Sequence, residues 1–364
     1  MILRLLTILA FVCLATSCSL FQRPQTDRED LVTISPSFEY EARKKVAVFP
    51  FENQERGDIN RMITENFSAR LIKAGFSVID SRQLEQAARA SGIILDRIPS
   101  VSQLKAIGSD LGVNTVVTGS CISPDSIIRD ELNISMISAR FIDVQTGETI
   151  LYAVVRPDGV APASRKLVAA VRASVMNSLF AKGNNAFDRG DIKTAISYYS
   201  SLITLDPTLI NALRNRGISY AKISDYSKAL DDLDQAIALA GCSLIDPSPD
   251  LMQCLLKTAP YWKVNSMIPN PPPDLISDRV DTAKKKVQAE LFVNRALVLY
   301  RSGNPAASIS DLDRALSAGA DPSTVYANRA VALVKLNKLD EALEDYNKDR
   351  KSIRLNSSHG KLSR

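Results

Sequence analysis

A repeat with a period of 34 residues constrains the fold of this chain more than any other feature. Gly183 recurs as Gly217 and, further along, Ala296 recurs as Ala330. A period of this length is typical of helix pairs that stack side by side, and small residues let two helices approach closely. The residues that we expect to pack these helices are Gly183, Ala195, Tyr199, Pro207, Gly217, Ala229, Leu233, Ala236, Ala296, Leu312, Ala315, Ala330, Ala342 and Tyr346. The carboxyl-terminal half is therefore predicted to be all-α.

These positions resemble the tetratricopeptide repeat (TPR) family, in which the small residue of one helix receives a bulky side chain from its neighbour. The resemblance implies an all-α solenoid that binds protein partners in a groove lined by the first helix of each repeat. A tripeptide of Asn, Arg and a small residue also recurs in the first helices. The candidate peptide-binding residues are Asn184, Asn215, Asn294 and Asn328.

Two of these asparagines, Asn184 and Asn215, match the TPR subfamily that grips the terminal carboxylate of a partner. The lysine that this subfamily carries three residues before Gly183 is replaced by Phe180. Two other roles remain open for the asparagines. They could bond to the backbone within the groove, or they could present amides to an extended peptide.

The amino terminus reads as an export signal over residues 1–17, with Arg4 followed by an apolar run and small residues. Residues 15–18, Ala-Thr-Ser-Cys, resemble the lipobox of bacterial lipoproteins, which implies lipidation at Cys18 and a Gram-negative outer-membrane anchor facing the periplasm. An ordinary signal peptide is the alternative. Residues 18–43 are polar and are predicted to form a flexible lipidated tether.

Residues 44–158 alternate short apolar runs with amphipathic helices, which predicts an α/β domain. The segments 46–53, 75–80, 111–120 and 139–148 resemble the curli-secretion (CsgG-like) superfamily, whose relatives include FlgO-type lipoproteins, lipoprotein activators of penicillin-binding proteins and the TolB amino-terminal domain. The chain lacks the long insertions that form the membrane-spanning hairpins of the curli channel. The resemblance therefore favours a periplasmic domain that docks onto a partner rather than a pore.

The repeats divide into a linking helix with a first TPR pair over residues 161–240 and a second, truncated pair over residues 287–348. A proline-rich insertion at 241–286 either separates the two pairs or decorates one edge of the array. It contains Cys242 and Cys254, which could form a local disulfide in an oxidising periplasm or could both be reduced.

The segment from Asp349 resembles the translation of a common sequencing adapter, so we expect residues 349–364 to be an artefact. This tail holds the only histidine, His359, and most of the formal net charge of +5. Without the tail and the signal the chain is close to neutral. The basic pI therefore gives no support for nucleic-acid binding.

No sequence motif points to catalysis, a cofactor or a metal. Without a natural histidine, triads that need one are excluded. The acidic runs around Asp232, Asp311 and Asp345 fit solvated helix faces, and Cys121 fits a buried thiol. We expect a non-enzymatic protein-binding scaffold in envelope assembly. The alternatives are a subunit of a curli-type export ring, consistent with a possible homo-oligomer, and, least favoured, a periplasmic enzyme.

Overall fold

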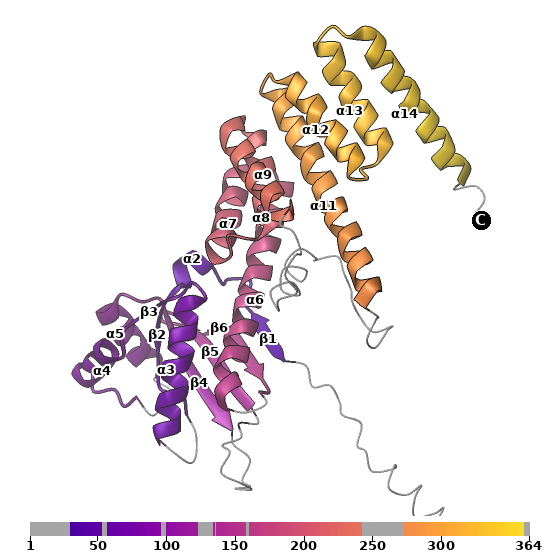
Figure 1. Cartoon of the computed structure of the whole chain (residues 1–364). Helices are drawn as coiled ribbons and strands as arrows, with labels where there is room; N and C mark the ends of the chain where they lie inside the picture. The colour runs from indigo at the N-terminus through magenta and orange to yellow at the C-terminus, as the bar shows by residue number, and fades with distance from the viewer. Residues whose placement is uncertain are drawn as a thin grey trace, which may run out of the picture. The chain divides into compact units, whose positions relative to one another are not determined.

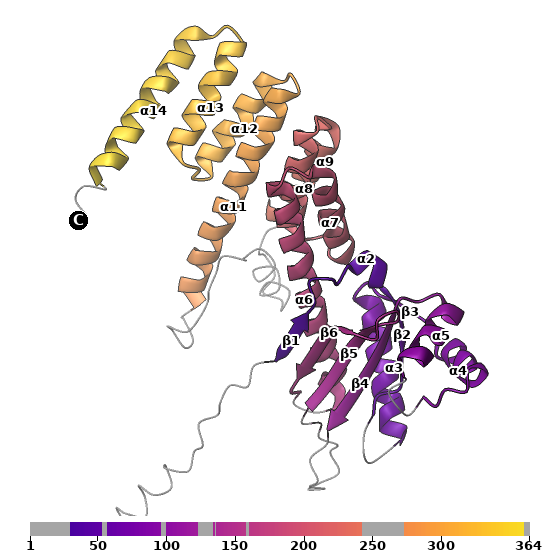
Figure 2. The same cartoon turned by 180° about the vertical axis from the view of Figure 1, so that it is seen from behind.

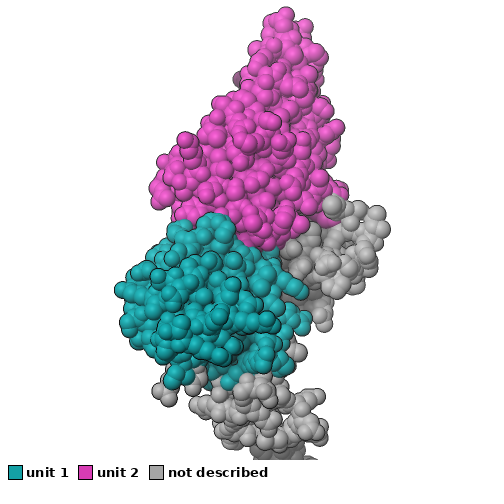
Figure 3. Space-filling model, turned by 90° about the vertical axis from the view of Figure 1, so that its left-hand side faces the viewer, with its two compact units in different colours: residues 1–174 teal, residues 175–364 magenta. Residues whose placement is uncertain are grey.

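The computed structural model describes residues 30–52, 57–95, 100–122, 134, 136–157, 160–241 and 273–359. The chain divides into two compact units, Met1–Ser174 and Val175–Arg364 (Figure 3). Cys18, Cys242 and Cys254 lie outside the described residues. Among the helices that are described, none is long and apolar enough to cross a membrane.

The first unit is built on one mixed sheet of six strands in the order β1-β6-β5-β4-β2-β3 (Figure 1). The strands are β1 Leu31–Ile34, β2 Lys45–Val48, β3 Ser77–Val78, β4 Thr115–Ile122, β5 Met136–Asp143 and β6 Thr149–Val155. Strand β2 runs parallel to β3 and β4, whereas β4, β5, β6 and β1 pair antiparallel. The mixed α/β architecture predicted for this region is compatible with this arrangement.

Helices cover both faces of the sheet around its β2 and β4 strands. One layer holds α4 Ser81–Ala90 and α5 Val101–Leu111, whose Leu84 and Ile107 pack on Phe49. On the other face, Phe67 of α3 Gly57–Lys73 contacts Phe51 with ring centroids 5.0 Å apart. Figure 2 views the chain from behind and shows the strands that α4 and α5 do not cover.

The predicted tether is shorter in the structure than the sequence indicated. Residues 31–34 form β1, which pairs with β6 at Leu31 and Val154, and α2 spans Tyr40–Arg43. Phe38 and Tyr40 are buried. The prediction of a flexible segment to residue 43 was therefore wrong from Leu31 onward, because four residues become a strand only by pairing with a partner far along the chain.

Helix α6, Val160–Asp188, belongs to both units. Ala163, Leu167 and Val171 are buried in the first unit, where Ser164 donates a hydrogen bond of 3.4 Å to the carbonyl of Ile63 on α3. Further along the same helix, Val175 and Leu179 are buried in the second unit. The linking helix predicted before the repeats is thus continuous with the first helix of the first repeat.

The described residues of the second unit form four helix pairs. Their first helices are residues 175–188 of α6, then α8 Ile210–Lys222, α11 Pro273–Arg301 and α13 Pro322–Lys335. Their second helices are α7 Ile192–Leu205, α9 Tyr226–Gly241, α12 Pro305–Ser317 and α14 Leu339–His359. The turn at Gly190 has φ +80°, and Asp191 caps α7 through the Thr194 amide.

The second and third pairs stack directly on each other although Gly217 and Ala296 are 79 residues apart, 45 more than one period. Leu233 and Ala236 of α9 share one buried cluster with Leu291 of α11. Of the two arrangements left open by the sequence, separation of the pairs is wrong. Helix α11 also begins at Pro273, inside the range predicted for the insertion.

Candidate protein-binding site

Close contact between a small residue and a bulky one fixes each helix pair. A Cβ atom at Gly183 would lie 2.7 Å from the Tyr199 ring, and one at Gly217 would lie 3.1 Å from the Ala229 carbonyl oxygen. Tyr199 is 1% exposed, and burial raises the pKa of its hydroxyl. Gly183 and Gly217 thus leave no room for a larger side chain beside the second helix of their pair.

An arginine on each of three first helices pairs with a buried aspartate on the second helix of the same repeat. Both Nε and Nη2 of Arg216 donate to Asp232, at 2.8 and 2.7 Å. The pairs Arg295 with Asp311 and Arg329 with Asp345 repeat this geometry at 2.6 and 2.7 Å. Paired hydrogen bonds between guanidinium and carboxylate fix orientation as well as distance, so each pair aligns its two helices.

The same arginines also reach the preceding repeat. Arg295 Nη1 donates to Asp234 of α9 at 2.5 Å, and Arg329 pairs in the same way with Asp313 of α12. The hydrogen bonds that Arg295 donates to Asp311, and then to Asp234, raise the pKa of Arg295 despite its partial burial. We call this series of pairs the arginine ladder; it links the second, third and fourth repeats.

The aspartates of the ladder correct one prediction. Asp232, Asp311 and Asp345 are 5%, 3% and 2% exposed, so they are not on solvated helix faces as we expected from the acidic runs. The signal was present in the sequence. Each of these aspartates follows the arginine of an Asn-Arg-small tripeptide by 16 residues.

Hydrogen bonds and ring contacts join neighbouring first helices. We call the surface that residues 175–188 of α6 form together with α8, α11 and α13 the first-helix face (Figure 1). Asn215 of α8 donates to Asn184 Oδ1 of α6 at 3.2 Å, and the Tyr199 hydroxyl donates to the same oxygen at 2.8 Å. Arg214 of α8 donates to Glu290 of α11 at 3.0 Å. The face therefore runs without interruption across the insertion point.

The candidate peptide-binding asparagines differ in their surroundings. Asn184 and Asn215 bond to each other, whereas Asn328 donates to the Thr324 carbonyl at 2.8 Å, one of the backbone roles we considered. Asn294 is half-buried on α11. The structure thus joins two of the four asparagines, and it places a carboxylate, Glu290, on the neighbouring helix.

Apolar side chains are exposed along the first-helix face. Leu297, Val331 and Val334 are 37%, 41% and 47% exposed, and Ile218 occupies the position of Leu297 in the repeat before. Single exposed apolar residues are common, but Leu297 and Val331 stand at one repeat position on adjacent helices and form a row with Ile218, which is half-buried. Sequence reasoning missed this row because it considered only polar candidates on these helices.

Tyr346 does not pack as predicted. It is 44% exposed, whereas its counterparts Leu233 and Leu312 are buried against the helix that follows them, as in the cluster of Leu312 with Val325. No helix among the described residues covers α14 in that way. The other packing residues predicted within the helices, including Ala195, Ala229, Ala315, Ala330 and Ala342, are buried.

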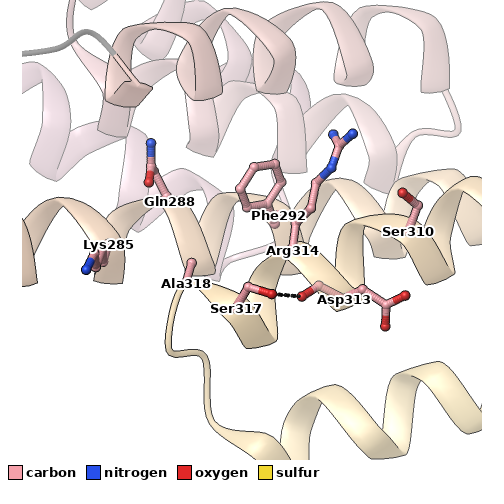
Figure 4. Close-up of a pocket in the computed structure, with 8 residues that line it drawn as sticks. All are labelled: Lys285, Gln288, Phe292, Ser310, Asp313, Arg314, Ser317 and Ala318. Carbon is pink, nitrogen blue, oxygen red and sulfur yellow. Dashed lines mark hydrogen bonds between the residues drawn. The ribbon is translucent and has the colours of Figure 1, made fainter.

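A shallow hollow of about 510 Å³ lies between α11 and α12 (Figure 4). Phe292 and Arg314 line it, with the guanidinium 5.9 Å from the ring centroid, and Ser317 donates to the Asp313 carbonyl at 2.9 Å. Elsewhere in the described residues, Cys121 is buried and its burial raises the thiol pKa to about 11. No group of three potential metal ligands occurs in the described part of the chain.

Comparison with known proteins agrees with the repeat geometry. The tetratricopeptide repeat family model matches residues 293–352. Sperm-associated antigen 1 of Mus musculus is 30% identical over 109 residues, covering 30% of this chain and 10% of that protein. Hsp70-Hsp90 organizing protein 3 of Arabidopsis thaliana is 45% identical over 51 residues, covering 14% of this chain and 9% of that protein. The chain thus spans about a tenth of the length of these relatives.

Two solved structures are also similar to parts of the chain. The crystal structure of MamA has 18% identity and a TM-score of 0.36, covering 55% of this chain and 91% of that one. The NMR structure of E. coli LpoB has 23% identity and a TM-score of 0.25, covering 31% of this chain and 56% of that one. The repeat geometry and the family match together show that the chain contains a TPR region.

Proposed function

We propose that this protein is a non-enzymatic scaffold that holds a partner protein on its first-helix face. The observation that carries this proposal is the alignment of adjacent first helices, of which α11 and α13 expose the apolar side chains of Leu297, Val331 and Val334. Proteins whose names describe them as organizing Hsp70 and Hsp90 resemble this chain over short stretches, which supports a role in protein binding.

The cellular setting belongs to the same proposal and rests on the amino-terminal sequence. The lipobox-like residues 15–18 support a lipoprotein anchored through Cys18 to the outer membrane and facing the periplasm. The α/β domain, with its CsgG/FlgO-like segments, would then dock onto an envelope assembly beside the TPR region. Two binding modules on one anchored chain raise the local concentration of partners.

The binding role is tested by site-specific photo-crosslinking of the full chain in cells. A photoreactive residue at Val331 on α13 should form adducts with a second protein. The matched control is the same residue at the exposed Gln235 on the second helix α9, which should not. Identical adducts from both positions, or only a homo-oligomeric ladder, would contradict the proposal and favour the export-ring alternative.

The anchoring role has its own test. Mass spectrometry of the membrane-extracted protein should find acyl chains on Cys18, and Cys18→Ser should release the protein into the soluble periplasmic fraction. Cleavage with no acyl group on Cys18 would contradict anchoring but leave the binding role intact.

A further inference from the structure

Charges are divided unevenly between the first and second helices. Helices α8 and α13 contain no acidic residue, whereas α9, α12 and α14 hold the aspartates of the arginine ladder. On the repeat portion of α11, residues 287–301, the acidic residue is Glu290, which Arg214 pairs with. The exposed charges of this face are therefore mainly basic on α8, α11 and α13, whereas on α6 the exposed Asp188 stands at the repeat position of Lys222.

Three basic residues stand at the same repeat position on adjacent first helices. They are Lys222, Arg301 and Lys335, spaced by 79 and 34 residues, and all three are exposed. The ammonium group of Lys222 lies 4.0 Å from the centroid of the Phe187 ring, and that of Lys335 lies 4.7 Å from the Tyr300 ring. Contact with an aromatic face holds a lysine in place while leaving its charge open to a ligand.

This basic row runs beside the apolar row of Ile218, Leu297 and Val331, which lies four residues earlier on each helix. Residues four apart on a helix are neighbours on its surface. The two rows therefore form a strip with an apolar side and a cationic side that crosses three repeats.

The polar side chains of Asn184, Asn215 and Glu290 on the same face already form hydrogen bonds within the chain. Asn184 Oδ1 accepts from Asn215 and from Tyr199, and the Glu290 carboxylate lies beside Arg214 where it would repel a second carboxylate. This arrangement disfavours binding of a partner's terminal carboxylate beside Asn184, Asn215 and Glu290.

We infer that the first-helix face binds an internal, acidic and apolar segment of its partner. Apolar side chains of the segment lie on Ile218, Leu297 and Val331, and its carboxylates lie beside Lys222, Arg301 and Lys335. This inference rests on the proposed binding role and names the chemistry of the partner.

The test uses two fluorescent synthetic peptides of Leu and Glu, or of Leu and Lys, both with amidated carboxyl termini, titrated against the full chain. The Leu and Glu peptide should bind, and the triple variant Lys222→Glu, Arg301→Glu, Lys335→Glu should weaken it about tenfold, since each exposed pair contributes modestly. The triple variant should instead bind the Leu and Lys peptide. The control Lys73→Glu, Arg82→Glu, Lys105→Glu makes the same change of charge on exposed residues of the first unit and should leave both affinities unchanged.

Circular dichroism confirms that each variant is folded before titration. Equal weakening by both triple variants, binding of the Leu and Lys peptide to the unmodified chain, or binding that requires a free terminal carboxylate would overturn the inference. If Val331 still crosslinks a partner while the Leu and Glu peptide fails to bind, the chemistry of the segment is wrong and the binding role stands. If Val331 crosslinks nothing, the binding role itself fails.

Discussion

Asp231 and Asp232 are neighbours in the sequence with opposite surroundings. Asp231 is exposed, whereas Asp232 is 5% exposed and receives two hydrogen bonds from Arg216. We expect Asp232→Asn to lower the free energy of unfolding of the repeats by about 2 kcal/mol, because a partly buried guanidinium loses its charged hydrogen-bond partner. Asp231→Asn should change it by less than about 0.5 kcal/mol. Urea unfolding followed by circular dichroism measures both, and equal effects would show that the ladder does not stabilise the array.

Sequence reasoning at the scale of single residues succeeds at some positions of the repeats and fails at others. Gly183 and Tyr199 could be predicted to touch because a small residue at one repeat position implies a bulky one opposite it. Asp232 could not be separated from Asp231 by composition, since a run of acids fits a solvated face equally well. Only its distance of 16 residues from Arg216 distinguishes it.

At the scale of elements, local patterns predicted the type of nearly every helix and strand in the first unit. The apolar runs within residues 44–158 form strands such as β4, and Gly112, which has φ +57°, follows the end of α5 at Leu111. Strand β1 was missed because Leu31–Ile34 carries no signal longer than four residues and is defined by its partner β6. Long-range pairing of this kind lies outside any local window.

The direct packing of α9 on α11 predicts that the intervening segment is dispensable for the array. Deletion of residues 242–286 removes the 45 residues in excess of one period, including the part of α11 from Pro273 to Lys286, and joins Gly241 to Val287. We expect the unfolding midpoint of the repeats in urea to be unchanged, because Arg295 can still bond to Asp234 and Asp311. Loss of cooperative unfolding in the deleted chain would mean that the segment holds the two pairs together.

At the scale of the whole molecule, α6 contributes to two cores. Ala173 is exposed on this helix, so Ala173→Pro removes no buried side chain but breaks the helical hydrogen bonding. We expect hydrogen exchange to accelerate in both units, with a cost of about 3 kcal/mol. Ser81→Pro is the control, because it places proline at the first position of α4, where helices accept it. Faster exchange in one unit alone would contradict a shared role for α6.

The shared helix also limits how such a chain can change by insertion or deletion. Ala163, Leu167, Val171, Val175 and Leu179 follow one another at intervals of four, and the last two belong to a different unit from the first three. One residue added between Val171 and Val175 would turn the second group by about 100° around the helix axis relative to the first. Insertions are therefore expected to be tolerated less within either group than in the loops of its unit, because each group must keep its four-residue spacing to stay buried in its own core.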